Sequence, residues 1–179
     1  MTVWTIGHSN RSLDEFLTLL ATFEIEVLAD VRRFPGSRKH PHFNRDALAQ
    51  SLAEAGITYE SFPELGGRRK PRPDSPNTAW RNESFRAYAD YMETGEYRAG
   101  IERLLSIAEE RRVAIMCSEA VWWRCHRSLI ADYLKNEGIT VEHISSPKKS
   151  EPHPYTSAAR LVGGRLTYAE SDPQARLFR

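Results

Sequence analysis

The sequence has few cysteines, few lysines and no long apolar segment. Its 179 residues include only two cysteines, too few for a disulfide framework. No run of about 18 apolar residues occurs, so a transmembrane helix is not expected. The first residues, MTVWTIGHSN, also lack the basic and apolar pattern of a secretory signal. We therefore expect a soluble, cytoplasmic protein with free cysteines and no membrane partner.

The sequence also lacks a large excess of positive or negative residues. The 25 Lys and Arg residues are almost balanced by 24 Asp and Glu, and the net charge is +1. Proteins that bind extended duplex nucleic acid usually carry a larger basic excess. Arginine nevertheless supplies 20 of the 25 basic residues. Because its guanidinium group grips phosphate or carboxylate through two parallel hydrogen bonds, the positions of the arginines become informative.

Short β-rich runs alternate with amphipathic segments along the chain. Alternation of this kind predicts an α/β fold, with a mainly parallel sheet of about five strands flanked by helices in three layers. Ser12 and Asn44 are predicted to cap the first two helices. The predicted strands are residues 3–7, 27–31, 59–62, 113–117 and 141–144, and the predicted helices lie near residues 13–23, 44–55, 85–92, 101–108 and 129–134.

The chain divides into a main part and a polar tail. Residues 1–146 are expected to form a single α/β domain. Residues 147–179 are expected to form a C-terminal extension that packs on this domain or trails from it. The extension contains a possible hairpin around Gly163 and Gly164, since paired glycines favour tight turns between strands.

Three polar loops follow predicted strands. Open α/β sheets bind ligands at the carboxyl ends of their strands, so these loops are candidates for a shared site. The first loop, residues 30–45, is rich in arginine and histidine and has no acid after Asp30. The second loop, residues 63–73, is also basic. Gly66 and Gly67 in this loop would allow the backbone to approach an anion closely.

The arginines that could hold an anion lie in or next to these loops. Asp30 precedes two of them and either orients their guanidinium groups or takes part in catalysis itself. We expect them to bind a phosphate-bearing or other anionic partner, either a small molecule such as a nucleotide or a nucleic acid. The predicted anion-binding arginines are Arg32, Arg33, Arg38, Arg68 and Arg127.

The third loop lies in the stretch MCSEAVWWRCHRSLIADYL, which contains both cysteines. Cys117 ends a predicted buried strand, and Cys125 lies at the start of the next helix. Unpaired amides and the positive end of the helix dipole stabilise a thiolate at such a position. A cysteine here could act as a nucleophile, with His126 or His8 as acid or base, and Glu119 could orient the histidine or handle protons itself. The alternative is that both cysteines only pack in the core.

Two known uses of cysteine fit this stretch less well. Phosphatase and rhodanese-like loops place an arginine where this sequence has Trp123. The spacing of the cysteines and histidines is not that of a zinc finger or ribbon. In addition, Cys125 and His126 are expected to point away from each other on a helix. We therefore predict no metal site and no cofactor.

Several ordered blocks of sequence carry a family resemblance. They are TIGHSNRSLDEFL, LADVRRFPGSRKHPHFN, FPELGGRR, MCSEAVWWRCHRSLIADYL and HPYTSAARLVGGRLTY. Together they resemble the domain of unknown function 488 family over essentially the whole chain. The resemblance implies an α/β domain without an agreed activity and assigns no catalytic role to any residue. It also implies that the following residues share one site: His8, Asn10, Asp30, Arg32, Arg33, Ser37, Arg38, His40, Glu64, Cys117, Glu119, Cys125, His126 and Arg127.

Two hypotheses of different class follow. In the first, the protein is a thiol-dependent transferase or hydrolase whose cysteine attacks, or exchanges sulfur with, an anionic substrate. Glu64 would orient the binding groups, as Asp30 would. The polar residues expected to bind the anion beside the arginines are His8, Asn10, Ser37 and His40.

In the second hypothesis, the protein is a non-catalytic nucleic-acid-binding module. The same arginines would contact phosphates, and the cysteines would merely pack. Trp80, Trp122 or Trp123 would then stack on bases, since aromatic faces bind single-stranded bases with little sequence preference.

Overall fold

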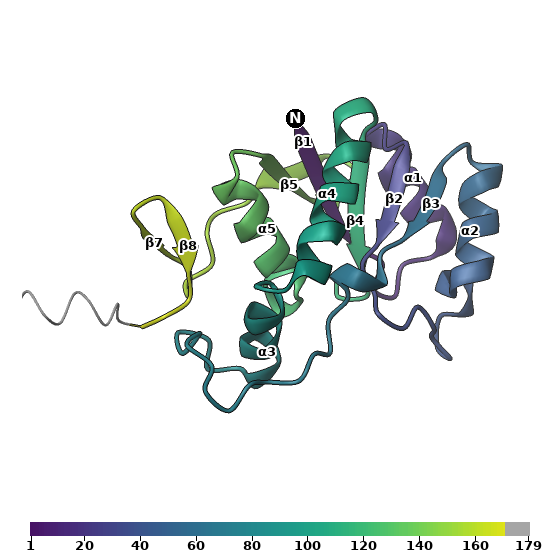
Figure 1. Ribbon diagram of the computed structural model, residues 1–179. Coiled ribbons are helices and arrows are strands. Elements are labelled where there is room, and N and C mark those ends of the chain that lie inside the picture. The colour runs from purple at the N-terminus through teal and green to yellow at the C-terminus, as the bar shows by residue number, and fades with distance from the viewer. Residues whose placement is uncertain (171–179) are drawn as a thin grey trace, which may run out of the picture.

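The computed structural model describes residues 1–170, and its centre is a six-stranded sheet (Figure 1). The strands are β1 Thr2–Gly7, β2 Val27–Asp30, β3 Thr58–Ser61, β4 Val113–Cys117, β5 Thr140–Ser146, β6 Lys149–Pro152, β7 Arg160–Val162 and β8 Arg165–Thr167. The order in the sheet is β3-β2-β4-β1-β5-β6. Strands β1 to β5 are parallel, and β6 runs antiparallel to β5. The predicted α/β fold with a mainly parallel sheet is confirmed, with β6 as an additional edge strand.

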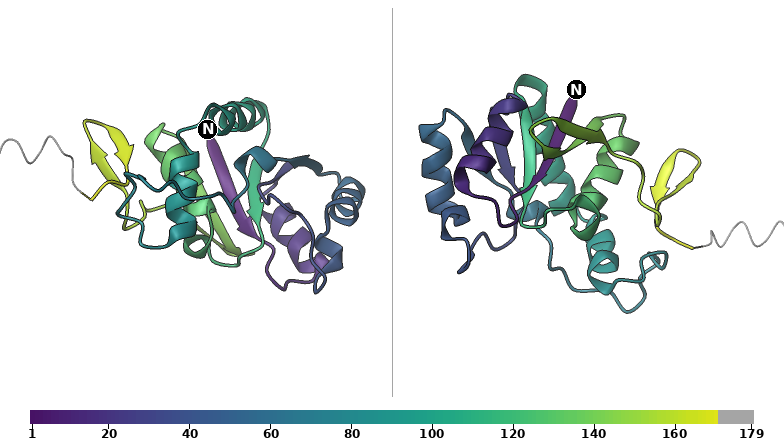
Figure 2. Two further views of the ribbon diagram at one scale, coloured as in Figure 1. Left: turned by 60° about the horizontal axis from the view of Figure 1, so that its bottom comes forward. Right: turned by 180° about the vertical axis from the view of Figure 1, so that it is seen from behind.

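Helices cover both faces of this sheet. The α-helices within residues 1–170 are α1 Leu13–Thr22, α2 Arg45–Glu54, α3 Glu83–Tyr91, α4 Gly95–Glu110 and α5 Arg127–Asn136, and the short 3-10 helices are η1 Pro41–Phe43, η2 Pro63–Leu65 and η3 Trp122–Arg124. Helices α1 and α2 lie on one face, and α4 and α5 lie on the other, with α3 packed against α5 (Figures 1 and 2). None of these helices is both long and apolar enough to cross a bilayer.

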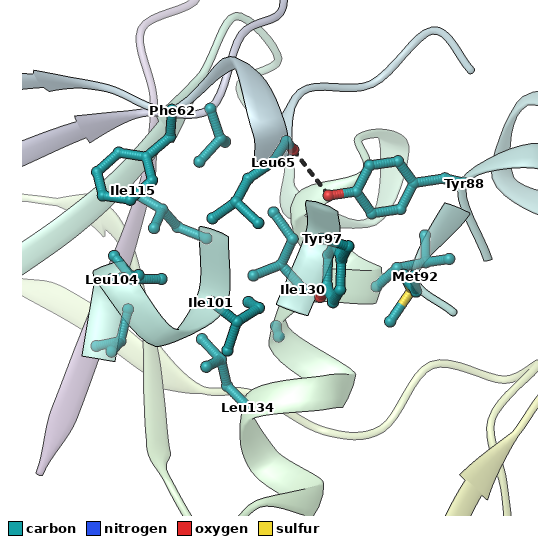
Figure 3. Packing of buried hydrophobic residues seen from close by; sticks show 14 of the residues in the cluster. Phe62, Leu65, Tyr88, Met92, Tyr97, Ile101, Leu104, Ile115, Ile130 and Leu134 are labelled. Atoms are coloured by element: carbon teal, nitrogen blue, oxygen red, sulfur yellow. Dashed lines mark hydrogen bonds between the residues drawn. The ribbon is translucent and has the colours of Figure 1, made fainter. Parts of the chain in front are cut away.

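The core consists of two apolar clusters because side chains of a strand alternate between the faces of the sheet. In β4, Ala114 and Met116 belong to the cluster under α1 and α2. Val113 and Ile115 belong to the larger cluster under α4 and α5, part of which is shown in Figure 3. Cys117 continues this second set. The last residue of β4 therefore faces the side of the sheet on which α5 begins.

Two predicted helix caps behave differently. The Glu15 amide donates to the Ser12 hydroxyl oxygen at 3.1 Å, which confirms Ser12 as the cap of α1. Asn44 precedes α2 as predicted, but its side chain makes no capping hydrogen bond. Its Oδ1 atom instead accepts a hydrogen bond from the Ser37 amide at 2.6 Å. The Asn44 side chain thus ties down the first polar loop.

Residues 147–170 extend the fold in two ways. Strand β6 adds an edge to the sheet, and β7 pairs with β8 in the hairpin expected around Gly163 and Gly164. The hairpin stands to one side of the sheet (Figure 2). After it, Tyr168 is buried, and its carbonyl oxygen accepts a hydrogen bond from the Ala79 amide at 2.8 Å. The last part of the expected extension, residues 171–179, lies outside the described residues.

The register of the sheet brings the carboxyl ends of β1, β2 and β4 together. Gly7 of β1 pairs with Cys117 of β4, and Asp30 of β2 pairs with Met116. Glycine is required at position 7 because a Cβ atom there would lie 1.7 Å from the carbonyl oxygen of Glu119. The loop after β4 therefore crosses directly over the end of β1. This edge is where α/β sheets generally bind ligands.

Candidate active site

A cavity of about 870 Å³ opens at the carboxyl ends of β1, β2 and β4. Its volume lies within the range of small-molecule sites, roughly 300–1,000 Å³. All three polar loops contribute to its wall. The predicted site residues that line it are His8, Asn10, Arg32, Arg33, Ser37, His40, Arg68, Cys117, Glu119, Cys125 and His126.

The other predicted site residues do not line this cavity. Asp30 and Arg127 are buried in the protein. Arg38 is exposed in the first loop. The carboxylate of Glu64 forms an ion pair with Arg103, with 2.9 Å between the two groups. The buried side chains of Asp30 and Arg127 can therefore act on a ligand in this cavity only through their neighbours.

The cavity also contains residues that sequence reasoning missed. Ser84, Phe85 and Tyr88 belong to or border α3, which lies over the end of the sheet. Phe34 is 63% exposed and also lines the cavity. The available sequence indication was the long connection that leads into α3, residues 66–82, because connections of that length are often functional.

Cys125 and His126 form a dyad at the start of α5. His126 Nδ1 lies 3.4 Å from Cys125 Sγ, and His126 Nε2 lies 2.8 Å from the Val31 carbonyl oxygen. A carbonyl oxygen only accepts, so Nε2 carries the proton and Nδ1 is an acceptor that faces the sulfur. The expectation that these side chains point apart is therefore wrong. Cys125 caps η3 and His126 caps α5, so the pair does not lie within a helix.

The two cysteines differ in acidity. Burial raises the pKa of Cys117 well above its ordinary value. Burial also raises the pKa of Cys125, but a hydrogen bond from Cys117 and the positive charge of Arg127 outweigh burial and lower this pKa to about 7. The Arg127 amide, in the first turn of α5, also donates to Cys125 Sγ at 3.5 Å. Burial lowers the pKa of His126, so its ring is neutral at pH 7 and able to accept a proton.

Arg127 is buried behind the dyad. Its Nη1 donates to Thr5 Oγ1 at 3.2 Å, and its Nη2 donates to the Glu119 carbonyl oxygen at 2.7 Å. Within residues 1–170, no carboxylate forms an ion pair with Arg127. A buried charge without a counter-charge is costly. Ionisation of the Cys125 thiol would place a negative charge beside it, and the charge of Arg127 in turn lowers the Cys125 pKa.

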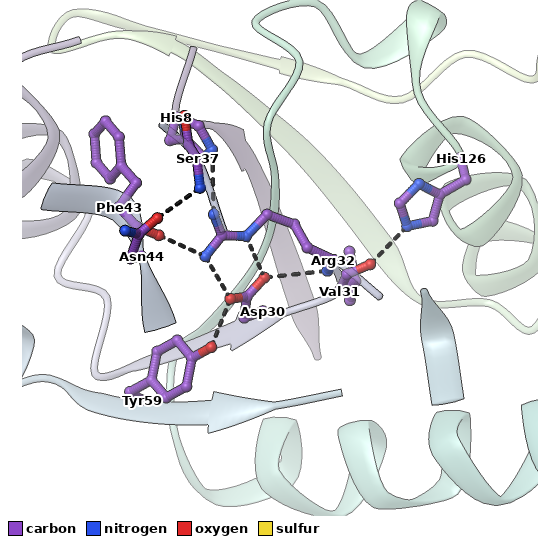
Figure 4. Close-up of polar contacts among 9 residues, drawn as sticks. All are labelled: His8, Asp30, Val31, Arg32, Ser37, Phe43, Asn44, Tyr59 and His126. Carbon is purple, nitrogen blue, oxygen red and sulfur yellow. Dashed lines mark hydrogen bonds and ion pairs between the residues drawn. The ribbon is translucent and has the colours of Figure 1, made fainter. Parts of the chain in front are cut away.

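Arg32 is held by Asp30 in the cavity wall. Its Nε and Nη2 atoms donate to the two carboxylate oxygens at 2.9 and 2.7 Å, and the Tyr59 hydroxyl donates to the same carboxylate at 2.6 Å (Figure 4). Nη1 faces His8 Nε2 at 3.4 Å. Burial lowers the pKa of His8 to about 4, so this ring is neutral at pH 7. Because Asp30 neutralises Arg32, the net positive charge of the cavity comes from other arginines.

The second loop packs tightly against the first loop and the dyad. A Cβ atom on Gly66 would lie 2.7 Å from Arg33 Cα, and a Cβ atom on Gly67 would lie 3.1 Å from His126 Nδ1. The Arg33 side chain in turn donates to the Arg68 carbonyl oxygen at 2.8 Å. The lack of a side chain at Gly66 and Gly67 therefore lets the second loop pack closely against Arg33 and His126. This packing accounts for both glycines without an anion beside them.

A family model matches the chain over residues 12–134, more than half of its length, and its description is domain of unknown function DUF488. The chain belongs to the DUF488 family. This confirms the resemblance noted from the sequence blocks. No curated protein and no solved structure matches the chain. In this DUF488 protein the matched segment contains both cysteines, His126 and Arg127, whereas β1 and everything after α5 lie largely outside it.

No group of three or more His, Cys, Asp or Glu side chains within residues 1–170 is arranged to hold a metal ion. Cys117, Cys125 and His126 lie near one another, but their contacts are hydrogen bonds within the protein: Cys117 Sγ donates to the Glu119 carbonyl oxygen, and Cys125 Sγ lies 3.4 Å from His126 Nδ1. The arrangement is that of a thiol beside an imidazole nitrogen that can accept its proton.

Proposed function

We propose that this DUF488 protein is a cysteine-dependent enzyme in which Cys125 attacks an anionic substrate bound in the cavity. One observation carries the proposal: the Val31 carbonyl fixes the His126 ring so that Nδ1 faces Cys125 Sγ. Nucleophile, base and a third group that orients the base form the arrangement expected of an activated cysteine. Both dyad residues line the cavity.

The surroundings of Cys125 support its role as the nucleophile. Its pKa of about 7 makes the thiolate abundant at neutral pH. Cys117 is a poorer candidate because burial keeps its thiol protonated. The Cys117 thiol instead donates a hydrogen bond to the Glu119 carbonyl oxygen, with 3.9 Å between the two atoms. This assigns different tasks to the two cysteines that the sequence left equivalent.

The charge of the cavity favours an anionic substrate. Arg33, Arg68 and Arg124 line it and are exposed, whereas Glu119 is the acidic residue of the lining. Arginine matches the geometry of phosphate through paired donors. The exposed ring of Phe34 adds a flat apolar surface to the same wall. A phosphate-bearing molecule with an aromatic ring, such as a nucleotide, combines the two features.

The chemical step conserves protons and electrons. The Cys125 proton moves to His126 Nδ1, and the sulfur electron pair forms a bond to the electrophilic phosphorus or carbon of the substrate. The leaving group departs with the electron pair of its old bond and takes the proton from His126. Water or a second nucleophile then gives its proton to His126 Nδ1 and displaces the sulfur, and this proton returns to Cys125, which restores the thiol and the neutral ring. Water would make the enzyme a hydrolase, and any other acceptor would make it a transferase.

A nucleic-acid-binding module is supported less well. The ring of Trp122 is stacked on His143, with 4.6 Å between ring centroids and 5° between planes. Trp80 packs against Phe85 and Tyr168. Of the tryptophans named for base stacking, Trp123 is the exposed one, and it does not line the cavity. Stacking of several bases beside the arginines therefore has little structural support.

Alkylation with mass spectrometry tests the proposal. The intact protein is treated with iodoacetamide at pH 7, and the modified peptides are quantified over time. We expect Cys125 to react about tenfold faster than Cys117, because the thiolate is the reacting species. Inorganic phosphate and adenosine monophosphate should each slow the reaction of Cys125. Equal, slow labelling of both cysteines would overturn the assignment of Cys125, and labelling that neither anion slows would overturn the anionic substrate.

A further inference from the structure

The guanidinium group of Arg127 is held from behind by a continuous array of buried side chains. Nη1 of Arg127 lies 3.2 Å from Thr5 Oγ1, and Thr5 Oγ1 lies 2.6 Å from His143 Nδ1. His143 Nε2 lies 2.8 Å from His153 Nδ1, and His153 Nε2 lies 2.9 Å from Asp132 Oδ1. All five side chains are buried. We refer to Arg127, Thr5, His143, His153 and Asp132 as the buried array.

Asp132 sets the direction of the hydrogen bonds when each histidine of the buried array carries one proton. The carboxylate only accepts, so His153 donates to it from Nε2 and accepts from His143 Nε2 at its own Nδ1. His143 Nδ1 is then the acceptor for the Thr5 hydroxyl proton. A guanidinium group only donates, so the Thr5 oxygen also accepts from Arg127. Burial lowers the pKa of His143 to about 3, which keeps this ring neutral at pH 7.

Packing holds the array rigidly. Trp122 is stacked on His143 and lies edge-on to His153. Asp132 accepts hydrogen bonds from the Thr156 amide at 2.9 Å and the Thr156 hydroxyl at 2.6 Å, and a further one from the Tyr168 hydroxyl at 2.8 Å. With His153, four donors therefore saturate its carboxylate. A buried network in which every acceptor of the carboxylate is paired is rigid.

The contacts of Arg127 connect this array to the dyad. Nη2 of Arg127 binds the carbonyl of Glu119, which lies in the loop over the end of β1. The positive charge of Arg127 acts on Cys125, and its amide donates to the same sulfur. Thr5 is the link that orients the other guanidinium nitrogen. Loss of this link would leave Arg127 free to turn away from the sulfur.

We propose that Thr5, His143 and His153 are positioning residues that hold the Arg127 guanidinium in place for the Cys125 nucleophile. This inference rests on the proposed function of Cys125. It adds that the active site extends beyond the segment matched by the family model, because these three residues lie outside that segment. Strand β5 and the residues after β6 are then part of the catalytic apparatus, through contacts that never reach the cavity.

The test compares two substitutions of Thr5 in the full-length protein. Thr5→Val keeps the side-chain shape and removes the hydroxyl, whereas Thr5→Ser keeps the hydroxyl. The rate of Cys125 alkylation by iodoacetamide is measured across pH. We expect Thr5→Val to move the midpoint of the profile upward by about one unit, which is about a fivefold slower reaction at pH 7. Thr5→Ser should stay within about twofold of the unchanged protein.

Further variants separate positioning from loss of stability. His143→Leu removes both ring nitrogens, whereas His143→Gln retains a donor and an acceptor. This pair repeats the comparison of Thr5→Val with Thr5→Ser at a second position of the buried array. Tyr168→Phe removes a hydrogen bond to Asp132 without interrupting the path from Arg127. We expect it to lower the thermal midpoint and leave the alkylation profile unchanged.

The outcomes distinguish this inference from the proposed function. Slow labelling of Cys125 in the unchanged protein contradicts the proposed function itself. Rapid labelling that is the same in the unchanged protein, Thr5→Val and His143→Leu contradicts the inference alone. A shift in Tyr168→Phe as large as that in Thr5→Val would also overturn it, because the effect would then follow stability and not the array.

Discussion

His126 Nδ1 lies 3.4 Å from Cys125 Sγ while the opposite nitrogen of the same ring binds the Val31 carbonyl at 2.8 Å. The second contact joins the end of β2 to the turn between η3 and α5, which is far from β2 in the sequence. The histidine has a single usable tautomer, and its free nitrogen faces the sulfur. The dyad is therefore organised by contacts within the protein itself.

Replacing His126 tests whether this ring activates the sulfur. His126→Phe keeps an aromatic ring beside Tyr88, which the imidazole contacts with 5.1 Å between centroids, but removes both nitrogens. We expect Cys125 alkylation at pH 7 to slow by about tenfold, because no adjacent base remains to accept the thiol proton. The measurement is peptide-resolved mass spectrometry. Unchanged labelling of Cys125 would show that His126 is only a packing residue.

The pH dependence of alkylation reports the Cys125 pKa directly. Its surroundings lower this pKa to about 7 in the folded protein, below that of a free thiol. A lowered pKa favours the thiolate, so the reaction rate should rise through a midpoint near pH 7 and level off above about pH 8. Because this pKa is lower in the folded than in the unfolded protein, ionisation of Cys125 stabilises the fold at high pH. This contribution to the free energy of unfolding is lost as the pH falls through 7.

The unfolded protein supplies the control for that profile. In urea the neighbours of Cys125 are gone, and the midpoint should move up to that of a free thiol, about 8.5. Cys117 should show no rise near neutral pH in the folded protein, because burial raises its pKa. A folded-state midpoint for Cys125 that matches the urea value would contradict the proposed stabilisation by Arg127.

The arginines of the first loop offer a matched comparison for anion binding. Arg33 lines the cavity, and Arg38 lies five positions later in the same loop, exposed and outside the lining. We expect Arg33→Gln to weaken the protection of Cys125 by inorganic phosphate about tenfold, because one charge-assisted contact is lost. Arg38→Gln removes the same charge and should leave protection nearly unchanged. Equal effects of the two variants would indicate general electrostatic attraction without a specific site.

Sequence reasoning identified those parts of the site that depend on local physics. Cys125 was placed at a helix start because the pattern of apolar residues after it marks α5, and dipole and amide effects there do not depend on distant contacts. The orientation of His126 could not be predicted in this way. It depends on the Val31 carbonyl, which lies far away in sequence, and on the fact that the pair precedes the helix.

Other parts of the structure lacked a readable pattern. Strand β6 has the sequence KSEP, which is polar and ends in proline, so it does not resemble a strand until β5 is available to pair with it. Arg127 was expected to bind an anion in the cavity, and its burial was not foreseen. Its environment is formed by Thr5 and Glu119, contacts that only the folded sheet brings together.

The Asp30–Arg32 pair should stabilise the folded protein. It adds no net charge to the cavity. Both side chains are buried, and Arg32 Nη2 lies 2.7 Å from Asp30 Oδ2. Asp30→Asn leaves a buried guanidinium without its counter-charge, which should lower the free energy of unfolding by about 3–5 kcal/mol. The exposed pair of Arg103 with Glu60 is the control, and Glu60→Gln should cost no more than about 1 kcal/mol. Urea unfolding measures both, and similar values would contradict the role assigned to burial.

Gly7 should be irreplaceable because of the loop that crosses it. The Cβ of alanine at position 7 would meet the Glu119 carbonyl oxygen at 1.7 Å, so the loop must move. We expect Gly7→Ala to destabilise the fold by at least about 1–3 kcal/mol and to slow Cys125 alkylation, since Arg127 binds that same carbonyl. Gly36→Ala is the control, because a Cβ there meets no atom within 4 Å, and its unfolding free energy should change by less than about 0.5 kcal/mol. If Gly7→Ala unfolds like the unchanged protein and keeps its alkylation rate, the Glu119 carbonyl does not hold Arg127 in place.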